Sequence, residues 1–274
     1  MKIQIYQICY SQETLKNIPE GFLTLDNLSN ERPDWREYWP IRNYLLSNRL
    51  SDNVLYGFFS PKFHDKTGLN LVKINRFIAD NYKNQDTVSF SPFWDLSCIF
   101  QNVFEQGDFF HPGLADVCQK FADVHLSKFN LKESITHSQN TIFCNYFLAT
   151  KKFWYEWLSI GELLFETSEK KQSDLARLLN NTTTYGPQQL PMKIFVQERL
   201  ATISLLLNSK FRNLAYNPFH IGASSTPFNN FYNEAIVSDA LKRAYAYDYC
   251  PVYLNEFSHI RNKIIKKLST TTQD

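Results

Sequence analysis

The sequence predicts an α/β domain, and three observations lead to this prediction. Residues 2–10 alternate apolar and polar side chains, which is typical of a strand with one buried face. Residues 54–59, VLYGFF, form a short apolar run that ends at a Ser-Pro pair, as a buried strand does. A helical pattern over 70–82 follows, and 87–95 has the pattern of another strand. Strand, helix and strand in this order predict a right-handed βαβ unit.

The other elements follow from the same patterns. A helix is expected to begin at residues 33–35 and to be interrupted at Pro40, because proline breaks a helix interior. Further helices are predicted at 95–107, 115–129, 151–166, 192–209 and 234–247, and 141–149 is rich in β-formers. The polar stretch between 167 and 191 is the best candidate for a flexible loop.

We see no internal repeat and no linker between domains. We therefore expect one domain over residues 1–274, with a central mixed sheet flanked by helices. Its core would span about 1–210, and a helical C-terminal extension would span about 211–268.

Composition excludes several classes of protein. Hydrophobic residues make up 43% and charged residues 20% of the 274 residues, which is the composition of a globular chain. A net charge of +2 gives no electrostatic case for nucleic-acid binding. The five scattered cysteines contain no C-x-x-C pair, which favours a reducing compartment. With no leader-like start and no long apolar run, we expect a cytoplasmic protein, with the inner face of the membrane as a further possibility.

The C-terminal segment HIRNKIIKKL, residues 259–268, interleaves isoleucines with arginine and lysines. A solvated terminal helix is the simpler interpretation. A helix that contacts an anionic membrane surface is the sharper hypothesis.

Motif tests are mostly negative. The chain has no G-x-x-x-x-G-K-[ST], G-x-G-x-x-G, G-x-S-x-G or H-E-x-x-H. These absences argue against a P-loop enzyme, a dinucleotide-binding Rossmann domain, an α/β-hydrolase and a zincin. The chain also lacks D-x-D, and its histidines lack metal-ligand spacing, so no metal ligand is assigned.

A charged loop after strand 54–59 is the first candidate site, because open α/β sheets bind ligands at the carboxyl ends of their strands. It carries Lys62, His64, Asp65 and Lys66, and the second strand would deliver Asp95 to the same edge. Asp65, Asp95, His64 and His111 are the acid/base candidates. The alternative is a solvated surface turn.

Residues 192–209 read as a buried helix that carries three charges. These are Lys193, Glu198 and Arg199. Because buried charges are costly unless paired, Glu198 and Arg199 are expected to face a polar site or each other's neighbours.

The order of these segments resembles bacterial capsule and lipopolysaccharide glycosyltransferases of the GT-A type, related to the galactosyl- and galactofuranosyltransferases of surface glycans. The likeness rests on KIQIYQICYS, VLYGFFSPKF, the segment around His111, NTIFCNYFLATKKFWYEWLSIGELLF and KIFVQERLATISLL, and it spans most of residues 2–207.

The resemblance implies a Rossmann-like GT-A domain that transfers a hexose from a nucleotide-sugar, with UDP-sugars favoured, to a glycan or lipid-linked glycan. Lys62, Lys66, Lys193 and Arg199 would stabilise the departing diphosphate, and Glu198 would belong to the same donor site. If the reaction inverts, Asp95 or Asp65 would deprotonate the acceptor hydroxyl. Tyr6, Tyr10 or Trp94 would stack on the base or a sugar. Many such enzymes hold Mn²⁺ or Mg²⁺ through D-x-D, so its absence here makes metal-independent transfer plausible.

Two other functions remain open. A non-catalytic protein of the same fold that binds a glycan or a partner would suit an aromatic-rich cleft equally well. A hydrolase with Asp/His pairs is weaker, because no nucleophile motif is present.

Overall fold

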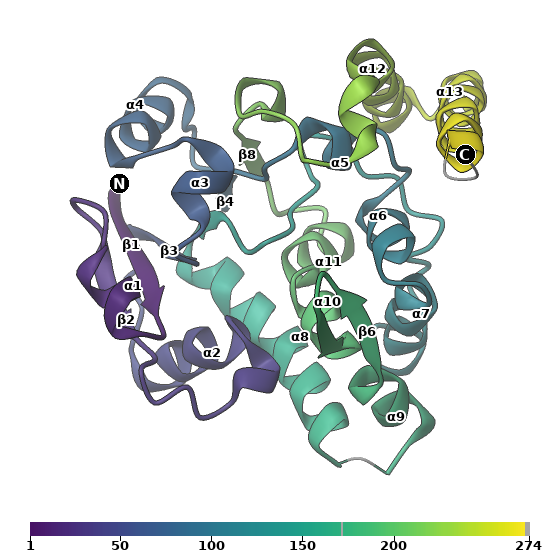
Figure 1. Ribbon diagram of the computed structural model, residues 1–274. Coiled ribbons are helices and arrows are strands. Elements are labelled where there is room, and N and C mark those ends of the chain that lie inside the picture. Colours follow the sequence, from purple (N-terminus) through teal and green to yellow (C-terminus); the bar gives the residue numbers. More distant parts are fainter. Residues whose placement is uncertain (171, 272–274) are drawn as a thin grey trace.

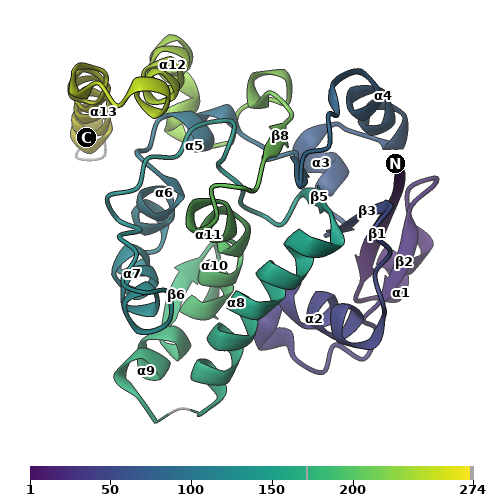
Figure 2. The ribbon, with the colours of Figure 1, turned by 180° about the vertical axis from the view of Figure 1, so that it is seen from behind.

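The computed structural model describes residues 1–170 and 172–271 as an α/β structure with a mixed six-stranded sheet flanked by helices (Figures 1 and 2). The spatial order of the strands is β2-β1-β3-β5-β4-β8. These strands are β1 (Lys2–Cys9), β2 (Leu23–Asp26), β3 (Val54–Phe59), β4 (Thr87–Ser89), β5 (Phe147–Ala149) and β8 (Asn213–Ala215). β5 runs against the direction that the other five share.

Helices make up most of the remaining described structure. The helices before β5 are α1 (Gln12–Lys16), η1 (Pro33–Trp35), α2 (Tyr38–Ser47), α3 (Phe63–Thr67), α4 (Leu71–Asn81), α5 (Trp94–Cys98), α6 (Val103–Phe110) and α7 (Leu114–His125). Those after it are α8 (Lys151–Lys170), α9 (Asp174–Asn180), α10 (Met192–Gln197), α11 (Leu200–Leu207), η2 (Pro218–His220), η3 (Pro227–Asn230), α12 (Tyr232–Asp248) and α13 (Pro251–Thr271). A hairpin of β6 (Thr182–Tyr185) and β7 (Gln188–Pro191) stands apart from the main sheet.

β3 lies inside the sheet and is buried along its whole length, as its apolar run predicts. Tyr56 and Phe58 belong to the large cluster that includes side chains of α2 and α8. Leu55 and Phe59 belong to a second cluster with side chains of α3 and α4. The alternation of side chains along the strand therefore divides the core into two layers.

The long helix α8 is fixed against the sheet by two close contacts. The indole Nε1 of Trp154 donates a hydrogen bond to the Tyr56 carbonyl at 2.9 Å. A Cβ at Gly161 would lie 2.6 Å from the Tyr38 ring, so this glycine lets α2 and α8 approach each other closely. These contacts connect α2, α8 and β3, the elements behind one wall of the candidate site.

Several predicted elements are confirmed, and others need correction. The strands at 2–10 and 54–59 and the helix at 70–82 are present within a residue or two. A separate first turn does precede α2, but Arg36, at φ 46°, makes the break. Pro40 lies in the first turn of α2, where the backbone N–H it lacks would have no partner within the helix.

Backbone conformation and breaks shorten three of the predicted segments. Cys144 and Asn145 have φ of 65° and 55°, so only the end of 141–149 is a strand. The helix expected at 192–209 is divided between α10 and α11 at Glu198 and Arg199. The predicted strand 87–95 stops at Ser89, which places Asp95 in α5.

The sequence patterns missed β2, β8 and the β6–β7 hairpin. β2 and β8 are short edge strands, so little hydrophobic alternation identifies them. β8 pairs with β4, which means that the predicted C-terminal extension also contributes a strand to the sheet. The hairpin occupies part of the polar stretch that we expected to be a flexible loop.

The two C-terminal helices pack on a third cluster around Trp94, Phe100 and Phe228. Ile264 of α13 is only 1% exposed in this cluster, and Ile260 packs against it. The apolar side that a membrane-lying helix would insert into lipid is therefore covered, and contact through the basic side chains stays a prediction. Within the described residues, no helix is long and apolar enough to cross a bilayer.

Candidate functional site

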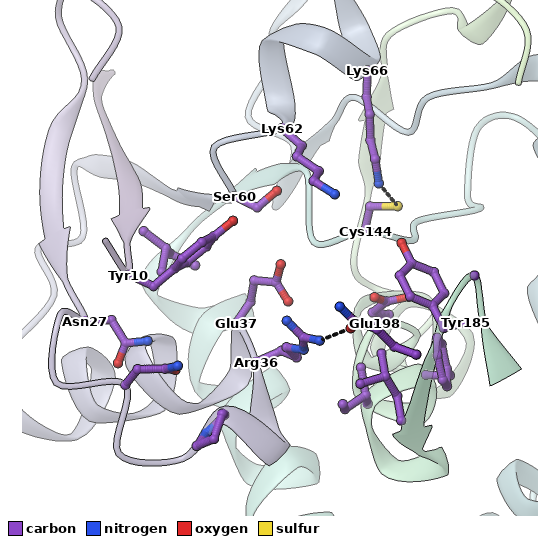
Figure 3. A pocket seen from close by; sticks show the side chains of 18 of the residues that line it. Tyr10, Asn27, Arg36, Glu37, Ser60, Lys62, Lys66, Cys144, Tyr185 and Glu198 are labelled. Atoms are coloured by element: carbon purple, nitrogen blue, oxygen red, sulfur yellow. Dashed lines mark hydrogen bonds between the residues drawn. The ribbon is translucent and has the colours of Figure 1, made fainter. Parts of the chain in front are cut away.

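A pocket of about 530 Å³ opens at the edge of the sheet where β1, β2 and β3 end (Figure 3). Because β5 is antiparallel, its first residues reach the same edge. Its position suits an open α/β sheet, and its volume suits a small ligand. It is lined by Ile8, Tyr10, Asn27, Asn30, Pro33, Arg36, Glu37, Ser60, Lys62, Lys66, Cys144, Tyr146, Tyr185, Gly186, Pro187, Gln188, Leu190, Ile194, Phe195 and Glu198.

Two lysines enter the pocket from the segment that follows β3. The short helix α3 lies just after the strand and ends at Gly68, whose φ of 64° favours glycine. Lys62 and Lys66 are four residues apart around this turn, so they lie on one side of it. Figure 3 shows both ammonium groups extending into the pocket.

Lys66 has neutral groups around its ammonium. Its Nζ lies 3.7 Å from the Cys144 thiol and 5.8 Å from the centre of the Tyr146 ring. Burial raises the pKa of Cys144 to about 12, so this thiol is uncharged at neutral pH. At the high pH where Cys144 ionises, its thiolate raises the pKa of Lys66, and the charge of Glu198 adds to the rise although burial opposes it. Lys66 therefore keeps its positive charge at neutral pH, where it is available to an anion.

Arg36 and Glu37 form the opposite wall, between η1 and α2. Arg36 has φ 46° and ψ −129°, a conformation that is costly for a residue with a Cβ and that occurs mainly at functional sites. Its Nη2 donates to Oε1 of Gln188 at 2.8 Å, which ties the β6–β7 hairpin to this wall. The guanidinium is thus held by a neutral amide.

Glu198 lies at the break between α10 and α11, and its side chain is 26% exposed. Burial raises the pKa of its carboxyl to about 7, and the charge of Glu37 adds to the rise, although Arg199 and Lys66 oppose it. At neutral pH the group is therefore divided between its acid and its base form. A carboxyl in this state can take up or release a proton near neutral pH.

Two exposed tyrosines flank the pocket. Tyr10 follows β1 and is 43% exposed, and Tyr185 ends β6 and is 47% exposed. Figure 3 shows them on opposite sides, with the lysines and the two carboxylates between them. Aromatic faces of this kind can stack on a base or a sugar ring.

The structure brings four of the predicted site residues together. Tyr10, Lys62, Lys66 and Glu198 all line the pocket, although they come from three distant parts of the chain. Parallel strands that end at one edge explain the first three. Glu198 joins them because the helix that carries it breaks at this point.

The predicted acids Asp95 and Asp65 are not in the pocket. Asp95 is fully buried and accepts hydrogen bonds from the Ser224 N–H at 2.8 Å and from the hydroxyls of Ser224 and Thr226. It therefore holds the loop between β8 and α12. Asp65 is exposed on α3 and does not line the pocket. The prediction that Asp95 joins the charged loop was wrong, because the strand ends before it.

His111 also has a structural position. Its ring stacks on Phe195 with 3.6 Å between the ring centres, and its Nδ1 lies 3.2 Å from the Thr184 carbonyl. Burial, helped by the charge of Arg199, lowers the pKa of His111 to about 4, so the ring is neutral at pH 7. The neutral ring supports the hairpin from behind Phe195, outside the pocket lining.

Three predicted donor-binding residues are bound elsewhere. Tyr6 shares a 2.7 Å hydrogen bond with Tyr44 and stacks on Phe58. The Nζ of Lys193 lies 2.7 Å from an Asp34 carboxylate oxygen. Arg199 donates to the backbone carbonyls of Phe195 at 2.6 Å and Val103 at 2.9 Å and to the Gln106 side chain at 2.9 Å. These groups stabilise the core, and none of the three residues lines the pocket, although the Arg199 Nη1 also lies 3.9 Å from the Glu198 Oε2.

Sequence reasoning missed Arg36, Glu37, Cys144 and Tyr185. The Arg-Glu pair directly precedes α2, and Tyr185 precedes the Gly-Pro turn of the hairpin. A charged pair before a helix and an aromatic residue beside a Gly-Pro turn are weak signals, and nothing in the sequence shows that they face β3. For Cys144, we find no sequence signal beyond its place before a strand.

The described part of the chain has no group of three or more His, Cys, Asp or Glu side chains that could hold a metal ion. The pocket carboxylates Glu37 and Glu198 are therefore assigned no metal. Comparisons with known proteins give no further guidance, since no family model, no curated protein and no solved structure matches this chain.

Proposed function

We propose that this protein is a glycosyltransferase that moves a sugar from a nucleotide-sugar, with UDP-sugars favoured, to a bacterial surface glycan of the capsule or lipopolysaccharide type. One observation carries the proposal. The pocket at the carboxyl ends of β1–β3 gathers the cations Lys62, Lys66 and Arg36 opposite Glu198, whose carboxyl has a pKa of about 7. This combination suits a reaction that releases an anion and needs a proton acceptor.

The proposed step assigns each group a role. The acceptor hydroxyl oxygen forms a bond to the anomeric carbon of the donor sugar, and the bond from this carbon to the phosphate oxygen breaks. The bonding electrons leave with the nucleoside diphosphate, whose charge Lys62, Lys66 and Arg36 stabilise. The hydroxyl proton passes to Glu198. Tyr10 and Tyr185 stack on the base or a sugar.

This assignment revises the roles that the resemblance implied. Glu198 replaces Asp95 and Asp65 as the base, because it alone of these three carboxylates lines the pocket. Arg36 replaces Lys193 and Arg199 as the third cation, because the latter two are bound to core partners. The mixed sheet flanked by helices is compatible with a Rossmann-like fold, which is the class of fold that a GT-A-type domain would have.

A thermal-shift panel with UDP, GDP, CDP, CMP and dTDP, each with and without Mn²⁺, tests the proposal. A nucleotide at one hundred times its Kd stabilises the folded state by about 2.7 kcal/mol. We expect a shift with one nucleotide that is clearly reduced in Lys62→Ala. A shift that needs Mn²⁺ would contradict metal-independent donor binding. No shift with any nucleotide would contradict the proposal and favour the non-catalytic glycan- or partner-binding protein.

A further inference from the structure

Two buried amides lie directly behind the pocket. Asn145 is 2% exposed and Gln197 is fully buried. The Asn145 Nδ2 donates to the Gln197 Oε1 at 3.2 Å, which connects the turn before β5 to the end of α10. Neither side chain lines the pocket, but each adjoins residues that do.

The pair is incompletely hydrogen-bonded. The Asn145 Oδ1 and the Gln197 Nε2 are buried and have no partner among the described residues. Exchanging the oxygen and nitrogen of both amides would again leave one acceptor and one donor unpaired. An apolar pair of similar shape would avoid this cost, so stability does not explain the two amides.

The position of the pair points to another role. Asn145 stands between Cys144 and Tyr146, which line the pocket, and it holds a left-handed backbone with φ 55°. Gln197 immediately precedes Glu198. Strained backbone conformations and incompletely hydrogen-bonded polar pairs cost stability, and in proteins they are found mainly at functional sites. We propose that Asn145 and Gln197 are positioning residues that hold the Glu198 carboxylate in the pocket.

A second link between the same two segments provides a matched control. The Thr202 hydroxyl accepts from the Ile142 N–H and donates to the Ile142 carbonyl, both at 2.8 Å. Thr202 is fully buried, but it lies four residues beyond Glu198, in α11. Removing this hydroxyl therefore loosens the same two segments without removing the link that adjoins Glu198.

The role of Glu198 as a base rests on the proposed function, but the test does not need activity. The ¹³C titration of the Glu198 carboxyl would be followed by NMR, with its signal identified by its loss in Glu198→Gln. The charges that face Glu198 come from Arg36, Glu37, Lys66 and Arg199. Gln197→Met, Asn145→Gly and Thr202→Val leave all of these charges in place, and glycine keeps the positive φ of position 145 accessible.

We expect Gln197→Met and Asn145→Gly each to lower the pKa of Glu198 by about one unit, a tenfold loss of proton affinity, because a carboxylate that is held less firmly becomes hydrated. Thr202→Val should leave the titration unchanged while it lowers the melting temperature. An unchanged titration in both amide variants, or an equal drop in Thr202→Val, would overturn the proposal. If the titration moves and no nucleotide binds, the positioning role stands and the glycosyltransferase proposal fails.

Discussion

Replacing Glu198 with glutamine is expected to change how the stability of this protein depends on pH. The pKa of the carboxyl is about 7 in the folded protein, against an ordinary 4.5. At pH values between these two pKa values, the Glu198 carboxyl keeps its proton in the folded protein and loses it in the unfolded chain. Raising the pH through this window therefore lowers the free energy of unfolding of the wild type. Below the ordinary pKa both states are protonated, and this loss of stability is absent. A glutamine cannot ionise, so the variant escapes this loss.

The size of the effect follows from the two pKa values. For one proton, each unit of pKa difference is worth about 1.36 kcal/mol, so the difference between the two pKa values corresponds to about 3 kcal/mol. Because the side chain is 26% exposed, solvent screening reduces this figure, and we expect about 1–3 kcal/mol. The variant should thus gain this much free energy of unfolding, relative to wild type, between about pH 4.5 and about pH 7.5.

Urea unfolding monitored by the fluorescence of the five tryptophans measures this difference at both ends of the window. Asp65→Asn removes an exposed carboxylate outside the pocket and shows what the loss of a surface charge does by itself. If the free energies of unfolding of Glu198→Gln and wild type differed by the same amount at both pH values, the pKa of the carboxyl would not be raised as we infer. Its assignment as the base would then lose its physical support.

Three further predictions concern the pocket lysines, the buried Asp95 and the partly exposed Asp34. Lys62→Ala and Lys66→Ala should each weaken nucleotide binding by about 10- to 100-fold, because each variant loses a charged hydrogen bond to the phosphates. Lys73→Ala, which removes an exposed lysine of α4, should leave nucleotide affinity unchanged. Equal nucleotide-binding curves for all three variants would contradict the phosphate site. Asp95→Ala should lower the free energy of unfolding by about 1–3 kcal/mol, because it leaves the Ser224 N–H unpaired. A variant that kept its stability and lost only activity would restore Asp95 as a catalytic candidate. Burial opposes ionisation of Asp34, but Arg32 and Lys193 outweigh it and lower the pKa to about 2, so stability should fall as the pH drops from about 4 to about 2. Lys193→Met should reduce that fall in acid unfolding curves, and a fall of unchanged size would show that Lys193 does not stabilise the carboxylate.

The positions of the candidate site residues show how far sequence patterns reach. Lys62 and Lys66 could be predicted because a buried strand and the loop that follows it are local features. Asp95 could not be placed, because the length of β4 depends on its pairing with β5 and β8, which come from distant segments. Arg199 and Glu198 are adjacent in the sequence, yet one is bound in the core and the other lines the pocket. Only the helix break between α10 and α11 separates their roles.

By itself, the sequence determined the α/β class, β1, β3 and α4, because hydrophobic periodicity within a segment reflects the faces that the segment must bury. It also placed a cationic segment at the carboxyl end of a buried strand. The tertiary structure decided which residues share the pocket. It brought Arg36 and Glu37 opposite Lys66, raised the pKa of Glu198 through burial, and withdrew Asp95 and Lys193 into the interior. Proximity and burial arise between segments far apart in the chain, and local patterns carry no record of them.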